Sequence, residues 1–252
     1  MITSSYRDEW ETVFDREIFL GERKFLYNMA IATFSHKIYE SVLEKYPHKE
    51  IAHLGSPNGR KPIWLLDIDG KEIVFYMSGI GACQAGNDLI EMQWQTGIMK
   101  FVIFGSAGSL DNEVTAGKYI IPTEAYRDEG MSYHYAPPSD YIDIRSSEIL
   151  KAKFKKFGLP YVCGKVWTTD APYRETKSAI DERKADGCIA VEMELAGVQA
   201  VCDFHGIELY SFLVAGDVLG GEKCDCEGLT GANHSIDNFD VALKLAEEME
   251  RY

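Results

Sequence analysis

Short, wholly apolar segments constrain the fold of this chain more than any other feature. Residues 101–104 read Phe-Val-Ile-Phe and residues 212–215 read Phe-Leu-Val-Ala, without polar residues at alternate positions. A strand of this kind is buried on both faces, as in a mixed or parallel sheet that helices cover. Stretches with the apolar spacing of helices lie between such segments. The resulting alternation of strands and helices predicts an α/β protein with right-handed crossovers.

The same patterns place the individual elements. Ser35 is a good N-cap before Ile38 and Val42 at helical spacing, and Asp69-Gly70 is a strong hairpin signal between two apolar runs. We expect strands at 27–34, 62–67, 72–77, 100–104, 161–167 and 208–215, and helices after Ser35, from about 82 to 95, at 193–204 and at 235–251.

Composition and charge limit the class of protein and of partner. Of the 252 residues 46% are hydrophobic, and the formal net charge is −14. We expect one domain at 25–252 after an N-terminal extension, 1–24, that is charged and lacks clear periodicity. The negative charge opposes binding to nucleic acid, and the apolar runs are far shorter than the roughly 20 residues of a membrane span. We therefore expect a cytoplasmic protein with small-molecule partners.

The six cysteines lack the paired spacing of a disulfide scaffold, so we interpret them as reduced thiols. Cys224 and Cys226 form a Cys-x-Cys pair with His234 nearby, but a second pair of metal ligands is missing. We interpret this segment as a plain loop and expect neither a metal nor an organic cofactor.

Four unusual segments follow the apolar runs, where ligands gather in open α/β sheets. They are Gly-Ser-Ala-Gly at 105–108, Thr-Thr-Asp-Ala-Pro-Tyr-Arg-Glu-Thr at 168–176, Val-Glu-Met-Glu at 191–194 and Gly-Asp at 216–217. The first is expected to be an anion-binding turn, because its small residues let backbone N–H groups approach an anion. A tight turn that binds nothing fits the same residues equally well. The second also fits a capped helix start, and the acids of the third also fit the general preference of acids for a helix N-terminus.

Taken in order, these motifs resemble those of the nucleoside phosphorylases and nucleosidases. This family includes bacterial purine nucleoside phosphorylase, uridine phosphorylase and methylthioadenosine nucleosidase. The similarity runs from about Tyr27 to the C-terminus and includes Ser-Gly-Ile-Gly at 78–81, and the segment 128–137 looks like its counterpart in uridine phosphorylases. The resemblance implies a three-layer α/β/α fold with a central mixed, partly barrel-like sheet flanked by helices.

The resemblance also implies a role for each site residue. Glu194 would grip the ribose hydroxyls, with Met193 against the face of the sugar and Glu192 beside them. Asp217 would protonate or hydrogen-bond the purine N7, and because uridine phosphorylases lack this acid, its presence favours purines. The base would contact Tyr173, Ala107, Gly108 and Asp217, and the phosphate would contact Gly105, Ser106 and Lys37.

These roles agree with the chemistry of the bond. Breaking a ribosyl C–N bond builds positive charge on the sugar and negative charge on the leaving base, so both ends need stabilisation. To protonate the base near neutral pH, Asp217 needs a pKa that its apolar surroundings raise. Such a proton transfer contributes about 10²- to 10⁴-fold in rate.

The sequence motifs give fewer indications of the molecule that accepts the ribosyl group. Family phosphorylases hold phosphate with two arginines, and at those places this chain has Thr-Phe-Ser-His-Lys at 33–37 and Ile-Phe at 103–104. Lys37 is at best a partial replacement, helped by Arg60 of this or a neighbouring subunit, because lysine binds phosphate only as a point charge. We expect a purine nucleoside phosphorylase that releases free base and ribose 1-phosphate.

Two other interpretations remain open. The first is a hydrolytic nucleosidase that uses water, for which His36 is the nearest candidate base, although a lone histidine is more often structural. The second is a nucleoside-binding protein without catalytic activity. The resemblance further implies a homo-oligomer, as a dimer, trimer or hexamer.

Overall fold

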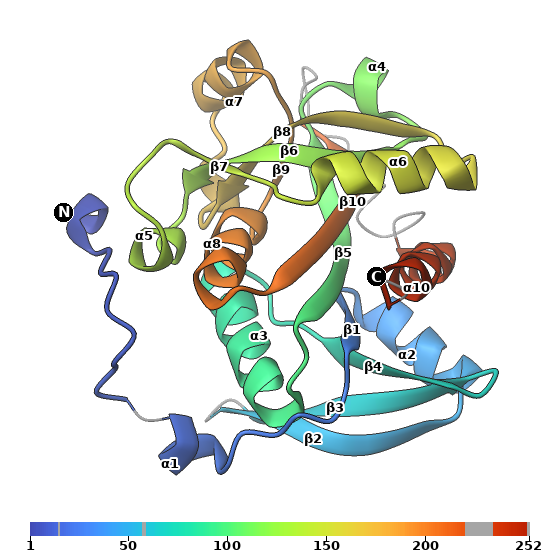
Figure 1. The fold of residues 1–252 in the computed structure, drawn as a ribbon. Coiled ribbons are helices and arrows are strands. Elements are labelled where there is room, and N and C mark those ends of the chain that lie inside the picture. Colours follow the sequence, from blue (N-terminus) through green and yellow to red (C-terminus); the bar gives the residue numbers. More distant parts are fainter. Residues whose placement is uncertain (15, 57–58, 220–233, 251–252) are drawn as a thin grey trace.

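A computed structural model describes residues 1–14, 16–56, 59–219 and 234–250, and a ten-stranded mixed sheet forms its centre (Figure 1). The strands are β1 (Met29–Thr33), β2 (His48–Ser56), β3 (Gly59–Ile68), β4 (Lys71–Met77), β5 (Lys100–Ser109), β6 (Tyr119–Asp128), β7 (Tyr141–Asp143), β8 (Tyr161–Thr169), β9 (Cys188–Glu192) and β10 (Glu208–Val218). β4, β1 and β5 run parallel to one another, and β3 and β2 continue from β4 in antiparallel pairs. These strands form an open wing of the sheet.

The rest of the sheet closes on itself through β5. β10 pairs with β5 in parallel, from Glu208↔Lys100 to Ala215↔Ala107, and it also pairs with β6 in antiparallel orientation. From β6 the order continues to β8 and β9, and β9 returns to β5 at Gly108↔Val191. β5, β10, β6, β8 and β9 therefore form a ring. The mixed, partly barrel-like sheet expected from the sequence is confirmed.

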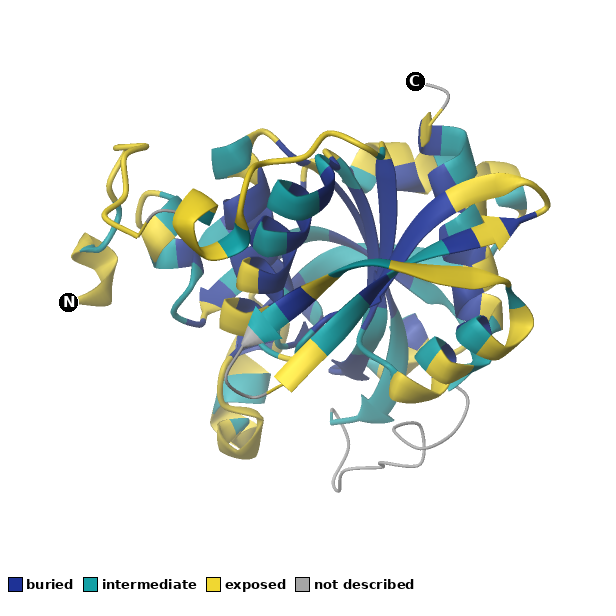
Figure 2. Cartoon of the chain, turned by 90° about the horizontal axis from the view of Figure 1, so that it is seen from below, coloured by how far each residue is buried: buried dark blue, intermediate teal, exposed yellow. Residues whose placement is uncertain are grey.

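Helices cover the sheet in two layers. The helices are α1 (Arg16–Leu20), α2 (His36–Lys45), α3 (Ala82–Thr96), α4 (Asn112–Thr115), α5 (Ser132–Tyr135), α6 (Ser147–Phe157), α7 (Lys177–Ala185), α8 (Leu195–His205) and α10 (Asp237–Glu250). α3 and α8 share one buried cluster with the sheet, whereas α2, α6 and α10 share a second cluster with the same sheet. Figure 2 shows the buried strands between these layers and the exposed N-terminal segment beside them. None of the helices in the described part is long and apolar enough to cross a membrane.

Most of the expected elements are confirmed, with two corrections. The turn expected at 105–108 is wrong: β5 continues to Ser109, because small residues there allow both β10 and β9 to pair with it. The helix expected from Met193 begins at Leu195, since the chain is still in β9 at Glu192. The sequence patterns did not indicate β2, β6, β7, β9 or α6. The burial of β2, for example, does not follow the alternation of a half-buried strand.

Phe212 of β10 is the centre of an aromatic cluster that joins the sheet to α6. Its ring stacks on Phe104 at 5.5 Å between centroids and meets Tyr119 and Phe154 edge-on at 5.6 and 5.5 Å. We expect Phe212→Ala to lower the free energy of unfolding by about 3–5 kcal/mol in urea titrations, because the fully buried side chain would leave a cavity. Ile149→Ala, at a position on α6 that is 44% exposed, should change it by less than about 0.5 kcal/mol. Equal, small losses in both variants would contradict this assignment.

Candidate active site

A cavity of about 570 Å³ lies where β1, β5 and β10 end. Of the site residues predicted from the sequence it is lined by Gly105, Ser106, Ala107, Gly108, Tyr173, Glu192, Met193, Glu194 and Asp217. β5 has β1 and β9 on one edge and β10 on the other, so the two sets of acids enter from opposite edges of β5. Because neighbouring strands are about 4.8 Å apart, β9 and β10 are separated by about 10 Å across β5.

The corner between β9 and α8 holds its two glutamates in different ways. Glu192 is buried, and its Oε2 accepts the backbone N–H groups of Glu194 and Leu195 at 2.7 Å each, while its Oε1 accepts the hydroxyl of Thr168. Glu194 is the N-cap residue of α8, and its Oε1 accepts the N–H of Gly81 at 2.7 Å. Glu192 thus fixes the corner, and Glu194 keeps more acceptor capacity for a ligand.

The proximity and burial of these two carboxyl groups alter their acidity. Burial raises the pKa of Glu192, and the neighbouring charge of Glu194 raises it further against the opposing effect of its hydrogen-bond donors. Burial also raises the pKa of Glu194, whereas the N–H of Gly81 lowers it. One proton is therefore easily kept on this pair, which reduces the negative charge at this end of the cavity.

The glycines of β5 are required by close approach of their neighbours. A Cβ at Gly108 would lie 2.6 Å from Cδ1 of Leu219 and 3.1 Å from Cγ1 of Val191, and a Cβ at Gly105 would lie 3.0 Å from Cδ2 of Phe34. These contacts leave the floor of the cavity as bare backbone beside Ser106. The segment is nevertheless a paired strand and not the open turn that the sequence suggested for an anion.

Asp217 is joined at the other end of the cavity by an acid that the sequence analysis did not single out. Burial raises the pKa of Asp217, the direction expected for a group that protonates a leaving base. Glu175 lines the same cavity, and burial together with the charge of Asp217 raises its pKa to about 7. Glu175 stands in the polar cluster at 168–176, so its carboxylate was visible in the sequence, but its distance to Asp217 was not.

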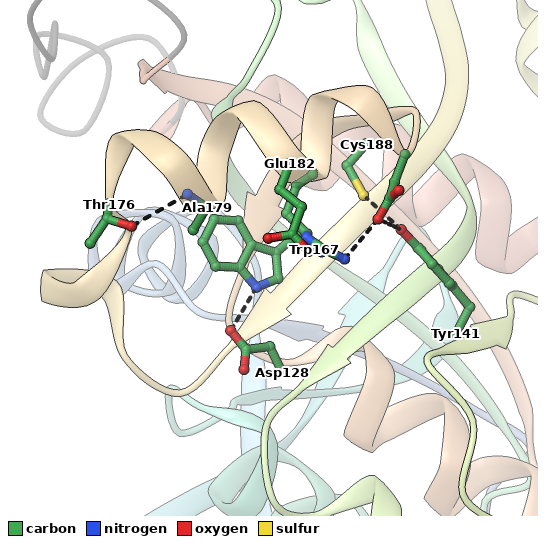
Figure 3. A network of polar contacts seen from close by, with 9 residues as sticks. Asp128, Tyr141, Trp167, Thr176, Ala179, Glu182 and Cys188 are labelled. Carbon is green, nitrogen blue, oxygen red and sulfur yellow. Dashed lines mark hydrogen bonds and ion pairs between the residues drawn. The ribbon is translucent and has the colours of Figure 1, made fainter.

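The segment that carries Tyr173 and Glu175 is fixed at both ends. At its start, Thr169 Oγ1 accepts the N–H of Ala171 at 3.1 Å. At its end, Thr176 caps α7 by accepting the N–H of Ala179 (Figure 3). Tyr173 lines the cavity and is 99% exposed.

A second network anchors α7 to the sheet behind this segment. Trp167 of β8 donates its Nε1–H to Asp128 at 3.1 Å, and the hydroxyl of Tyr141 lies 3.6 Å from Sγ of Cys188 (Figure 3). Arg183 of α7 lies over the ring of Tyr126 at 3.8 Å. Arg183 therefore attaches α7 to β6, whereas the other two contacts join β8 to β6 and β7 to β9.

The cations proposed for phosphate do not line the cavity. Lys37 is exposed on the first turn of α2, and Arg60 pairs with Glu50 on the surface. His36, the candidate base, is exposed and pairs with Glu40 at 3.1 Å. In place of these groups the cavity has Ser35 and His234, which the sequence analysis did not propose for it.

The Cys-x-Cys pair at 224–226 lies outside the described residues. Within 1–14, 16–56, 59–219 and 234–250, no group of three or more His, Cys, Asp or Glu residues could hold a metal ion.

Comparison with known proteins identifies relatives of this chain. The model of the Phosphorylase superfamily matches residues 30–249. The chain is 24% identical over 181 residues to a DeoD-type purine nucleoside phosphorylase of Exiguobacterium sp., covering 70% of this chain and 74% of that protein. It is 25% identical over 172 residues to the uridine phosphorylase of Salmonella typhimurium, covering 62% and 67%. It is also 27% identical over 161 residues to an uncharacterised protein of Acanthamoeba polyphaga mimivirus, where the match covers 63% of each chain, less than two thirds of that relative.

Solved structures share the fold at lower identity. A purine nucleoside phosphorylase of Toxoplasma gondii in complex with immucillin-H gives a TM-score of 0.73 at 19% identity, covering 90% of this chain and 93% of that one. A futalosine hydrolase mutant of Helicobacter pylori gives 0.69 at 19% identity, covering 89% and 100%. The Campylobacter jejuni 5'-methylthioadenosine/S-adenosyl homocysteine nucleosidase gives 0.69 at 17%, covering 89% and 99%. The same fold therefore serves phosphorylases and hydrolases.

The raised pKa of Glu175 makes stability depend on pH. Between its ordinary value of 4.5 and about 7, the folded protein holds a proton on Glu175 that the unfolded chain has released, so stability falls as pH rises through this window. We expect Glu175→Gln to flatten this dependence, with the largest relative gain in stability above pH 7. Urea unfolding at pH 5 and pH 8 measures it, and Glu44→Gln, at an exposed position on α2, is the control. An unchanged slope in Glu175→Gln would refute the effect.

Proposed function

The chain belongs to the phosphorylase superfamily, and we propose that it cleaves the N-glycosidic bond of a purine nucleoside in the cavity where β1, β5 and β10 end. One observation carries the proposal. Glu194 and Asp217 line this single cavity from opposite edges of β5, beside Ser106. A nucleoside placed across β5 would meet one acid at its sugar and the other at its base.

The two ends of the cavity match the two charges that develop in the reaction. Glu194, as a carboxylate, accepts hydrogen bonds from ribose hydroxyls and stabilises the positive charge of the sugar. Met193 would lie against the sugar, and Glu192 would hold Glu194 in place by accepting the backbone N–H of Glu194. Asp217, as a carboxylic acid, would donate a proton to the leaving base. Its raised pKa and the neighbouring Glu175 favour a proton at this end.

The preference for purines follows from the acid at the base end. A purine offers N7 as a ring nitrogen that accepts a proton as the bond breaks. Tyr173 would stack on the ring, and Ala107 and Gly108 would contact its edge through the bare floor of β5. Among the described lining residues, His234 is the one basic side chain, and it lies beside Ser35.

The charge of the cavity favours water as the acceptor. Four acids line it, Glu175, Glu192, Glu194 and Asp217, and its described lining contains neither lysine nor arginine. A phosphate dianion would meet this acidic lining without the bidentate cation that usually compensates its charge. Water is neutral and has no such electrostatic cost. We therefore propose hydrolysis as the first candidate for the reaction.

Phosphorolysis, expected from the sequence, is the second candidate. The floor formed by Gly105 and Ser106 supports it, since bare backbone and a hydroxyl are the groups that approach phosphate. Lys37, on the first turn of α2, remains a prediction for the same role. In this case the products would be free base and ribose 1-phosphate, with no organic cofactor.

A substrate panel tests the reaction and its acceptor. Purified protein is incubated with inosine, adenosine, guanosine and uridine, with and without phosphate, and base release is measured by chromatography. We expect release from purine nucleosides in phosphate-free buffer. Release that requires phosphate would select phosphorolysis, and binding without any release would select the inactive nucleoside-binding protein.

Variants of the two acids test their roles. We expect Asp217→Asn to lower kcat by about 10²- to 10⁴-fold, because the leaving base loses its proton donor. Glu194→Gln should lower kcat/KM, because the sugar loses a charged acceptor. Asp181→Asn, at an exposed position on α7, is the matched control and should retain full activity. Wild-type rates in Asp217→Asn would reject the assignment of this residue.

We also infer that the chain forms a homo-oligomer in which the N-terminal extension, 1–24, takes part. The extension carries large apolar side chains that are exposed in the single chain, namely Trp10, Val13, Phe14, Ile18 and Phe19. Apolar surface of this kind is buried when a second subunit covers it. A cytoplasmic location stays a prediction, and the free thiols of Cys83, Cys163, Cys188 and Cys202 support it.

Changing the apolar surface of the extension should change the assembly. We expect the double variant Phe14→Ser and Ile18→Ser to shift the mass measured by light scattering toward the monomer, because both side chains lose their apolar contacts. Ile149→Ser, at an exposed position on α6, should leave the mass unchanged. A monomeric wild type, or an unchanged mass in the double variant, would contradict the inference.

A further inference from the structure

A serine and a histidine from opposite ends of the chain meet at the wall of the cavity near β1. Oγ of Ser35 lies 2.7 Å from Nδ1 of His234, and both residues line the cavity. Ser35 comes just after β1, which pairs with β5 on the edge opposite to β10. The pair therefore lies across β5 from Asp217, away from the end assigned to the base.

Ser35 has a position that the backbone fixes. Its hydroxyl oxygen caps α2 by accepting the N–H of Ile38 at 3.3 Å. A hydroxyl has a second acceptor site, which can take the Nδ1–H of His234. In that tautomer Nε2 is the basic nitrogen of the imidazole, and the contact with Ser35 sets the orientation of the ring.

Each carboxyl group of the cavity already has a role in the fold or in the proposed function. Glu192 accepts hydrogen bonds from the start of α8, Glu194 serves the sugar, and Asp217 with Glu175 serves the base. Water that attacks the sugar must lose a proton to a nearby group. Among the described residues that line the cavity, His234 is the one nitrogen base.

We propose, on the basis of the function proposed above, that His234, oriented by Ser35, is the catalytic base that accepts a proton from the attacking water. The water oxygen forms a bond to the C1′ atom of the ribose as the C1′–N bond breaks. The electron pair of that bond goes to the purine, which takes the proton of Asp217. The proton of the water goes to His234, so free ribose and free base are formed and solvent returns the protons.

Kinetics of histidine variants test this role. We expect His234→Gln to lower kcat for base release by about 10²- to 10⁴-fold while the Kd for the nucleoside, measured by calorimetry, stays within about twofold. Added imidazole should restore part of the lost rate in His234→Ala, because it supplies the missing base. Ser35→Ala should lower kcat to a smaller extent, and Ser35→Thr, which keeps the hydroxyl, should retain it.

Two further variants serve as comparisons. His53→Gln, at an exposed position on β2, is the matched control and should keep the wild-type rate. His36→Gln tests the competing residue on α2. Full activity in His234→Gln, or a loss in His36→Gln in its place, would overturn the proposal. So would a rate loss in His234→Ala that imidazole does not restore and that accompanies a lower unfolding temperature. If the wild-type protein releases no base from any nucleoside, the proposed function itself fails. Failure of the His234 role differs from this, because the wild-type protein would then still release base.

Discussion

The pairing of β5 with strands on both of its edges is the constraint on which the site depends. β10 follows β5 from Lys100 to Ala107, and β1 and then β9 occupy the opposite edge. Side chains that come from distant parts of the chain therefore end at one place. The small residues at 105–108 make this possible, since a larger residue at Gly108 would collide with Leu219 and Val191. The strand pairing that closes the ring therefore also brings together the residues that line the cavity.

The acidic lining of the cavity is consistent with the charge of the whole chain. A protein with a formal net charge of −14 gives no long-range attraction to a phosphate, and its described cavity lining adds no lysine or arginine. Neutral molecules meet no such electrostatic penalty. Burial reduces the number of charges in the cavity by raising the pKa values of Glu192, Glu194 and Asp217. The cavity is therefore less negative than its composition suggests.

The sequence showed the acids of the site and missed its histidine for a physical reason. Asp217 follows the apolar strand expected at 208–215, whereas no strand was expected before Glu194, whose role came from the resemblance of Val-Glu-Met-Glu at 191–194 to the family motif. Glycine and serine at 105–108 carry no pattern of burial and favour a turn, whereas pairing with β9 and β10 makes this segment a strand. His234 meets Ser35 across 199 positions of sequence, a contact that no local periodicity encodes. Glu175 was likewise one polar residue among several.

The hydrogen bond between Gly81 and Glu194 has a consequence for the cost of binding. Gly81 has a φ of 93°, which favours glycine, and in this conformation its N–H holds the carboxylate of Glu194 from the start of α3. A free glutamate side chain would lose rotational entropy, worth up to about 2 kcal/mol, when it closed on a sugar. Here that entropy has been lost during folding. The loop before α3 thus holds the Glu194 carboxylate in one orientation before any ligand binds, although the N–H of Gly81 contacts only the protein.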